Sequence, residues 1–255
     1  MRVDLNCDLG ESFGAYVIGG DEEVLPHVTS VNIACGYHAG DHNIMAETVK
    51  LAKIHGVNVG AHPGYNDLMG FGRRHIDTTP EDIYHTVLYQ IGALHSFCKA
   101  YGVEMHHVKP HGALFNKASL DDATAAAIAE AVRDADPSLL LFGLSGSRLI
   151  HAGEKAGLAV VQEVFADRSY QPDGTLTPRS HREAVLTDPS EVVERAVRMV
   201  KEGRVRAVDG SEIILQADTV CIHGDGKNAA VFAIELKKEL EQAGVEIVAA
   251  GAVRR

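Results

Sequence analysis

The sequence predicts an α/β protein, and specifically an irregular (β/α) barrel with seven strands. Three observations predict this fold. Short apolar runs alternate with longer amphipathic runs along all 255 residues. The apolar runs are mostly continuous, as in parallel strands that are covered on both faces. Seven such runs in roughly 250 residues suit a TIM-like barrel better than an open doubly wound sheet.

Each apolar run predicts one strand, with right-handed crossovers between successive strands. The predicted strands are Val3–Cys7, Val28–Cys35, Val57–Ala61, Met105–Lys109, Leu139–Leu144, Val160–Phe165 and Thr219–His223. Neither a linker nor a shift in composition divides the chain, so we expect residues 1–255 to form a single barrel domain.

The clearest helix follows Thr79, a good N-cap residue, and Pro80, which suits a first helical turn. Apolar residues from Ile83 to Cys98 recur on one face, and Gly102 ends the run. Further helical patterns lie at 42–55, 120–135, 147–156, 189–202 and 227–243.

The remaining segments are connections, and three of them are informative. Residues 204–216 contain Asp209-Gly210 between two short alternating runs, which predicts a β-hairpin inserted before the last strand. Segments 62–79 and 165–187 are long for connections in this class of fold. Because long loops often carry function, we expect both to be active-site loops.

Composition and charge argue against several classes of protein. A net charge of −11 disfavours nucleic-acid binding, which needs clustered Lys and Arg. No apolar stretch approaches the ~20 residues that span a bilayer, and the first residues are too polar for a signal peptide. Four cysteines, Cys7, Cys35, Cys98 and Cys221, lie far apart without a CxxC pair. We therefore expect a reduced, cytoplasmic protein with buried thiols.

Polar, glycine-rich clusters follow six of the seven predicted strands. In a parallel α/β fold the carboxyl ends of the strands lie on one side, so these clusters should meet at one mouth. Charges are costly to bury unless they are paired, which favours an active site over a structural explanation. The polar residues at the strand ends are Asn6, Asp8, Glu11, His38, Asp41, His42, His62, Tyr65, Arg73, Arg74, Lys109, His111, Asn116, Glu163, Asp167, Arg168, Tyr170, His223 and Asp225.

These residue types suit hydrolysis at a carbonyl group. Asp8 and Asp167 can act as general acid or base, and the histidines titrate near neutral pH. Lys109 or Arg168 could hold a substrate carboxylate or stabilise an oxyanion. The sequence has no GxGxxG, no redox cysteine pair and no GxxxxGK[ST] loop. Redox chemistry is therefore disfavoured, and phosphate chemistry would need another site or another chain.

Two positions near the second strand allow more than one explanation. Asp41 could be functional, or it could simply be the N-cap of the helix that begins near His42. His38-x-x-x-His42, together with Asp8, could bind a divalent metal, although this spacing in a glycine-rich loop is weak evidence by itself. For Cys7, Cys35 and Cys221 we favour small buried side chains over nucleophiles.

Six motifs in this order resemble those of the LamB/YcsF family over nearly the entire chain. The motifs are DLNCDLGESFG, NIACGYHAGD, GAHPGYNDLMGFGRR, HVKPHGALFN, EVFADRSYQPDGTLTPR and CIHGD. The chain departs from the family pattern at Phe115, where we expect Tyr, and at Lys227, where we expect Pro. Either departure could alter substrate preference.

The resemblance implies an irregular barrel akin to the glycoside hydrolase/deacetylase superfamily. It also implies a hydrolase that cleaves the lactam of 5-oxo-L-proline to L-glutamate, coupled to ATP hydrolysis, with ATP (as its Mg²⁺ complex) as a co-substrate of the whole complex. The expected partners are the 5-oxoprolinase subunits B and C, and a homo-oligomer is compatible with this assembly. Phosphorylating the lactam oxygen would turn an unactivated amide into a good electrophile.

Within this hypothesis, Asp8 or a histidine activates water, while Lys109 and the arginines hold the substrate carboxylate and the phosphorylated oxygen. The candidate catalytic residues are Asp8, His38, Lys109, His111, Asp167 and His223. The candidate substrate-binding residues are Asn6, Glu11, His62, Tyr65, Arg73, Asn116, Arg168 and Asp225. Two alternatives remain: an ATP-independent, metal-dependent amidohydrolase or deacetylase, and a noncatalytic substrate-binding subunit.

Overall fold

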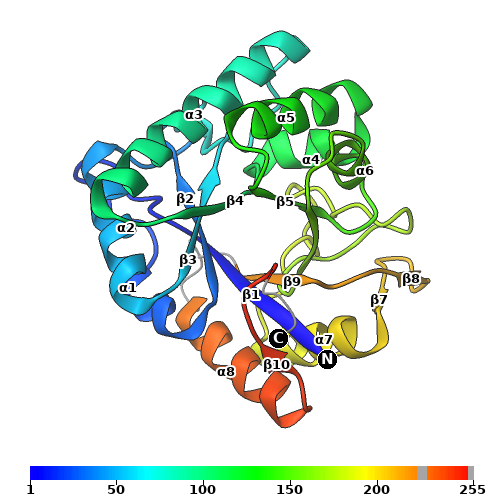
Figure 1. Ribbon diagram of the computed structural model, residues 1–255. Helices are drawn as coiled ribbons and strands as arrows, with labels where there is room; N and C mark the ends of the chain where they lie inside the picture. The colour runs from blue at the N-terminus through cyan, green and yellow to red at the C-terminus, as the bar shows by residue number, and fades with distance from the viewer. Residues whose placement is uncertain (223–228, 252–255) are drawn as a thin grey trace.

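The computed structural model of the chain describes residues 1–222 and 229–251. Its centre is a closed barrel of seven parallel strands with helices around it (Figure 1). In their order around the barrel, the strands are β1 (Arg2–Leu9), β2 (Ser30–Ala34), β3 (Asn58–His62), β4 (Met105–Val108), β5 (Leu140–Leu144), β6 (Val160–Phe165) and β9 (Thr219–Ile222). The barrel closes because β9 pairs with both β6 and β1. The predicted seven-stranded barrel is confirmed.

Strand β1 makes the barrel irregular, because different parts of it pair with three neighbours. Its first residues, Arg2 and Val3, pair with the short strand β10 (Glu246–Ile247). Residues 4–7 pair with β9, and residues 6–9 pair with β2. Strand β1, the dark blue ribbon near the centre of Figure 1, therefore joins β10, β9 and β2 in one sheet.

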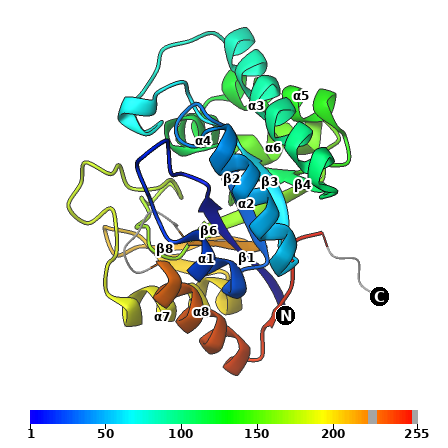
Figure 2. The same cartoon turned by 90° about the vertical axis from the view of Figure 1, so that its left-hand side faces the viewer.

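Helices surround the barrel on its outer side (Figures 1 and 2). They are α1 (Asp21–Val24), α2 (His42–His55), α3 (Pro80–Tyr101), α4 (Gly112–Leu120), α5 (Asp122–Ala135), α6 (Arg148–Lys155), α7 (Pro189–Glu202) and α8 (Ala229–Gln242). The other described elements are the 3-10 helices η1 (Leu25–His27) and η2 (Leu68–Gly70), and the antiparallel strands β7 (Arg204–Arg206) and β8 (Glu212–Ile214). Among the described residues, no helix has both the length and the hydropathy to cross a bilayer.

The longest helix, α3, begins and ends where its sequence signals predict. Oγ1 of Thr79 accepts a hydrogen bond from the backbone N–H of Asp82 at 3.1 Å, which caps the first turn. Gly102 ends the helix with a φ of 64°, a left-handed conformation that costs glycine little. An N-cap also accounts for Asp41, whose carboxylate accepts the N–H of Asn43 at 2.8 Å at the start of α2.

The helix predicted over 120–135 is present as α5, but the helix before it, α4, was not predicted. Helix α4 ends at Leu120, and a separate helix, α5, begins at Asp122. Asp121 lies between them and caps α5 by accepting the N–H of Thr124 at 2.8 Å. We did not predict α4 because it begins at Gly112, inside a motif that resembles a strand-end loop.

The interior of the barrel is polar, whereas branched apolar side chains dominate the interior of a typical TIM barrel. Successive residues of a strand alternate between its two faces, so one face of β1 carries Asp4, Asn6 and Asp8, and all three are buried. Asp4 accepts a hydrogen bond from the hydroxyl of Ser30 at 2.6 Å, and Asn6 donates one to Glu163 at 2.9 Å. Burial raises the pKa of Asp4 above its usual value, and the hydroxyl donors oppose this shift. This column of polar groups leads to the strand ends, where the candidate site lies.

Candidate active site

A pocket of about 330 Å³ opens at the carboxyl ends of the barrel strands. Asp8 enters it from β1, His62 from β3, and Lys109 and His111 from the segment after β4. The other polar and aromatic residues that line it are Arg73, Phe115, Asn116, Phe165, Arg168, Arg179 and Ser180. The pocket therefore combines one carboxylate and two imidazoles with four cationic side chains.

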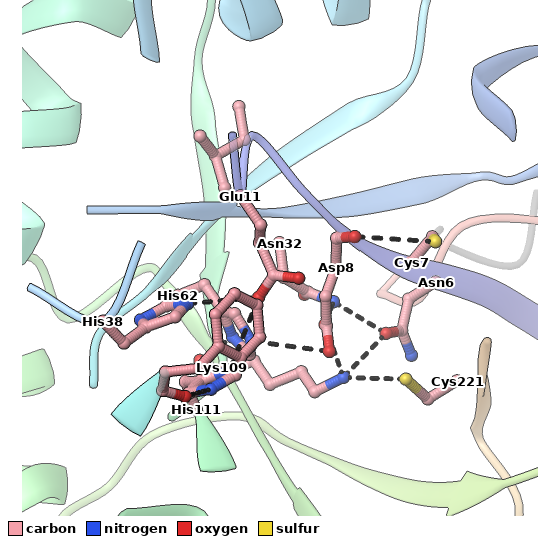
Figure 3. Close-up of polar contacts among 12 residues, drawn as sticks. Asn6, Cys7, Asp8, Glu11, Asn32, His38, His62, Lys109, His111 and Cys221 are labelled. Carbon is pink, nitrogen blue, oxygen red and sulfur yellow. Dashed lines mark hydrogen bonds and ion pairs between the residues drawn. The ribbon is translucent and has the colours of Figure 1, made fainter. Parts of the chain in front are cut away.

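Lys109 lines this pocket and is only 2 % exposed, and Figure 3 shows the polar contacts of its side chain. Its Nζ lies 2.9 Å from Oδ1 of Asp8, 2.8 Å from Oε1 of Glu163 and 3.0 Å from Sγ of Cys221. Burial alone would lower the pKa of Lys109, but Asp8, Cys221 and Glu163 outweigh it and raise the pKa well above its usual value. The side chain is therefore an ammonium ion that holds two carboxylates.

Asp8 is oriented by two donors. Its Oδ1 accepts hydrogen bonds from Lys109 and from the side-chain amide of Asn32, which lies 2.8 Å away. Asn32 is held in turn, because its Oδ1 lies 2.7 Å from Nε2 of His107. These contacts fix the carboxylate in the pocket wall, where a general base would be needed.

Three histidines and Glu11 form a buried group beside Asp8 (Figure 3). Nδ1 of His111 lies 3.0 Å from Nε2 of His62, and Nε2 of His38 lies 3.1 Å from Oε1 of Glu11. Burial lowers the pKa of both His38 and His111 well below the usual value, which favours neutral imidazoles. One donor atom from each of the four residues lies within 4.8 Å of the others, so the group could hold a metal ion.

The metal candidates from the sequence, Asp8, His38 and His42, differ from the group of four that the structure brings together. His38 belongs to the group of four, but His42 is exposed on the first turn of α2 and does not. The i, i+4 spacing does not bring the two rings together, because His38 lies in the loop before the N-cap Asp41 and only His42 is helical. Asp8 lies next to the group, with its Oδ2 3.5 Å from Nε2 of His62.

Cationic side chains from the two long loops form the outer wall of the pocket. Arg168 is buried, and its guanidinium donates to the backbone carbonyls of Ala184 at 3.0 Å and Thr177 at 2.6 Å. Burial lowers its pKa to about 10, so the side chain stays protonated at neutral pH. Arg73 lies over the ring of Phe71, 4.7 Å from its centroid. Arg168 thus braces the 165–187 loop while it faces the pocket.

The structure separates the predicted site residues into three sets. Those that line the pocket are Asp8, His62, Arg73, Lys109, His111, Asn116 and Arg168. Those that are buried without lining it are Asn6, Glu11, His38, Tyr65 and Asp167. His223 and Asp225, like Lys227, lie outside the described residues.

Some members of the site were not among the catalytic or binding residues chosen from the sequence. Glu163 pairs with Lys109, Cys221 contacts the same ammonium, Asn32 holds Asp8, and Arg179 lines the pocket. Glu163 could have been identified from the sequence, because a carboxylate within an apolar strand needs a buried partner. Burial raises the pKa of Cys221 well above its usual value, which agrees with a small buried thiol rather than a nucleophile.

Comparisons with known proteins match the chain over nearly its whole length. Residues 3–255 match the model of the LamB/YcsF family. The 5-oxoprolinase A subunit of Halalkalibacterium halodurans is 60% identical over 247 residues, which cover 97% of this chain and 96% of that protein. The 5-oxoprolinase A subunit of Bacillus subtilis is 55% identical over 249 residues, which cover 98% and 97%.

Solved structures show the same fold. The crystal structure of the lactam utilization protein from Thermus thermophilus aligns with a TM-score of 0.91 and 53% identity, covering 98% of this chain and all of that one. A structure described as T48 deacetylase with substrate aligns with a TM-score of 0.50 at 17% identity, covering 97% of this chain and 87% of that one. The second match supports only the deacetylase-like barrel. The family match and the identity to its members show that this chain belongs to the LamB/YcsF family.

Proposed function

We propose that this chain is the A subunit of an ATP-dependent 5-oxoprolinase, which opens 5-oxo-L-proline to L-glutamate together with subunits B and C. The observation that carries the proposal is the full-length similarity to two relatives named as 5-oxoprolinase A subunits, at 60% and 55% identity. The lactam utilization protein of T. thermophilus, with its TM-score of 0.91, supports a lactam as the substrate class.

The pocket suits a small anionic lactam. Its volume of about 330 Å³ lies at the lower end of the range for small-molecule sites. Arg73 and Arg168 offer guanidinium groups for the substrate carboxylate, since guanidinium binds carboxylate with two parallel hydrogen bonds. Lys109 places a positive charge beside Asp8, where the carbonyl oxygen would gain negative charge.

The coupling to ATP has a chemical reason. A five-membered lactam is a poor electrophile, and transfer of the γ-phosphoryl group to its oxygen activates the ring carbon. Water that Asp8 deprotonates adds to this carbon, and the C–N bond breaks as the nitrogen takes a proton. The resulting γ-glutamyl phosphate is then split by a second water into glutamate and phosphate. Asp8 supplies the base, and the cations hold the substrate and the phosphorylated oxygen.

ATP and Mg²⁺ enter this proposal through the assembly. The sequence has neither a Walker-type loop nor a kinase-like glycine loop. Partner subunits would therefore phosphorylate the substrate or complete a composite site over the loops at 62–79 and 165–187. Both loops contribute cations to the pocket, Arg73 from the first and Arg168 and Arg179 from the second.

We also infer that the protein works in the cytoplasm. Its four cysteines are free and buried. Free thiols that are kept away from oxidants are typical of proteins in reducing compartments.

One observation favours a second candidate, an ATP-independent metal-dependent hydrolase. The group formed by Glu11, His38, His62 and His111 has the ligand types of a catalytic metal site, and it adjoins the pocket through His62 and His111. A noncatalytic substrate-binding subunit would use the same pocket but would not need Asp8 as a base.

The three candidates can be separated with the reconstituted complex. The proposal predicts that glutamate and ADP form in equal amounts from 5-oxoproline, and that glutamate formation stops when ATP is omitted. Glutamate formation without ATP, lost after chelation and restored by metal, would support the metal hydrolase instead. Full turnover by a complex that contains Asp8→Asn would support the noncatalytic subunit.

A further inference from the structure

One ring nitrogen of His62, Nε2, faces one ring nitrogen of His111, Nδ1, and the hydrogen bonds of the two rings leave both nitrogens without hydrogen. Nδ1 of His62 lies 2.7 Å from the backbone carbonyl oxygen of Lys109, and Nε2 of His111 lies 2.8 Å from that of Phe71. A carbonyl oxygen only accepts, so both of these ring nitrogens must carry hydrogen. In neutral rings the opposite nitrogens, Nε2 of His62 and Nδ1 of His111, then carry none. They face each other at 3.0 Å, a repulsive arrangement that a bound cation would relieve.

The hydrogen bonds of the two rings are those expected of metal-bound histidines. A divalent metal ion binds neutral imidazoles through their unprotonated nitrogens, and the outer N–H groups of such rings commonly donate to carbonyl groups. His62 and His111 can donate in this way to the carbonyl oxygens of Lys109 and Phe71.

Two carboxylates complete the set of donor atoms. Oε1 of Glu11 lies 3.6 Å from Nδ1 of His111, and Oδ2 of Asp8 lies 3.5 Å from Nε2 of His62. Around a tetrahedral zinc ion with bonds of about 2.0–2.1 Å, neighbouring ligand atoms lie about 3.4 Å apart. The spacings of 3.0, 3.5 and 3.6 Å in this group are close to that value.

His38 has a different place in the group. Its ring stacks on that of His111, with 3.6 Å between centroids and 3° between planes. One ion cannot lie in the planes of two parallel rings, so His38 and His111 do not both bind it end-on. Nε2 of His38 instead lies 3.1 Å from Oε1 of Glu11, where it can donate and orient that carboxylate.

We propose that the chain binds one divalent transition-metal ion of the zinc class through Nε2 of His62, Nδ1 of His111 and the carboxylate of Glu11. Asp8 lies within reach as a further oxygen ligand, and His38 is a positioning residue for Glu11. The ligands come from the ends of β1, β3 and β4, so the folded barrel builds the site. This proposal goes beyond the proposed reaction, because it concerns metal binding by this chain without substrate, ATP or partners.

The wild-type chain tests the proposal directly. The full chain is stripped with a chelator and titrated with Zn²⁺ by equilibrium dialysis, and with Co²⁺ by visible absorption. We expect one ion per chain, a Co²⁺ spectrum with nitrogen and oxygen ligands, and a higher melting temperature with Zn²⁺. In ¹⁵N spectra of the imidazoles, Zn²⁺ should shift Nε2 of His62 and Nδ1 of His111. Absence of stoichiometric binding in these experiments would overturn the proposal without any variant.

Variants then identify the ligands. His62→Gln and His111→Gln should each weaken Zn²⁺ binding more than about 100-fold, which exceeds the usual cost of losing a residue that only supports a ligand. His42→Gln is the matched control, since His42 is exposed on α2, and it should bind as the wild type does. Equal affinity in the control, His62→Gln and His111→Gln would refute the assignment.

The role of His38 has its own test. His38→Leu removes the donor to Glu11 and should weaken Zn²⁺ binding about 10- to 100-fold. His38→Gln keeps an N–H near the position of Nε2, so it should restore most of the affinity. If both variants lost affinity equally, then positioning of Glu11 by His38 would be refuted.

Discussion

Nζ of Lys109 lies 2.9 Å from Oδ1 of Asp8, at the mouth of the barrel. The same ammonium lies 2.8 Å from Oε1 of Glu163, so one buried cation joins carboxylates from β1 and β6. The contact pairs the Asp8 carboxylate with an ammonium group in the pocket wall, and it also makes the site depend on the stability of the barrel. We therefore expect a substitution of Asp8 to affect mainly turnover, and a substitution of Lys109 to affect mainly the stability of the fold.

Removal of the negative charge of Asp8 should reduce turnover. Asp8→Asn keeps the size of the side chain and most of its hydrogen bonding, and Glu163 still pairs with Lys109. We expect kcat of the reconstituted complex to fall ~10²-fold or more, the usual scale for loss of a general base, with a smaller effect on stability. Asp167→Asn is the comparison, since Asp167 does not line the pocket. If Asp8→Asn kept near-normal turnover while Asp167→Asn lost it, the general base would be Asp167 rather than Asp8.

Removal of the ammonium should destabilise the fold. Lys109→Met leaves Asp8 and Glu163 buried without their shared cation, and we expect the free energy of unfolding to fall by about 3–5 kcal/mol. The double variant Lys109→Met/Glu163→Gln should recover part of this loss, because one buried charge is also removed. Chemical denaturation measures both effects.

A surface ion pair provides the control for this experiment. Arg198 and Glu212 lie 2.8 Å apart, but their side chains are 40 % and 38 % exposed. Arg198→Met should therefore change the free energy of unfolding by no more than about 1 kcal/mol. If Lys109→Met and Arg198→Met lowered the free energy of unfolding equally, the buried ion pairs of Lys109 with Asp8 and Glu163 would contribute no more to stability than a surface ion pair.

Arg168 should contribute to substrate affinity. Arg168→Gln removes a guanidinium that lines the pocket. Loss of a charged hydrogen bond worth about 1.5–3 kcal/mol should raise the KM for 5-oxoproline roughly 10- to 100-fold. Arg182→Gln is the control, because Arg182 lies in the same loop with its side chain 88 % exposed. Unchanged KM in a folded Arg168→Gln variant would exclude Arg168 from substrate binding.

The barrel could be predicted from the sequence because its strands are continuous apolar runs that stand out locally. The predicted run Val160–Phe165 matches β6 at both ends, and Thr79 and Gly102 bound α3 as predicted. Helix α4 was missed because its first residue, Gly112, has a φ of 53° and belongs to a loop-like motif. Local signals thus predicted the elements, except where a loop motif and a helix overlap.

The site was predicted at the level of residue types but not of partners. Asp8, His62, Lys109 and His111 were chosen because they lie at strand ends, and all four line one pocket, since the carboxyl ends of parallel strands share one mouth of the barrel. The contact of Lys109 with Glu163 depends on barrel closure, and sequence spacing carries no information about it. The metal candidates from the sequence were Asp8, His38 and His42, whereas the group in the structure contains Glu11, His62 and His111 beside His38.

In the proposed function this chain supplies one part of a shared reaction, and an assay of the purified chain alone is the most direct test. Glutamate and ADP are measured from 5-oxoproline with ATP and Mg²⁺, first with this chain and then with subunits B and C added. We expect negligible glutamate from the chain alone and ATP-dependent turnover by the assembly. Robust ATP-dependent turnover by the chain alone would contradict the shared reaction, and robust turnover without ATP would contradict the proposed coupling.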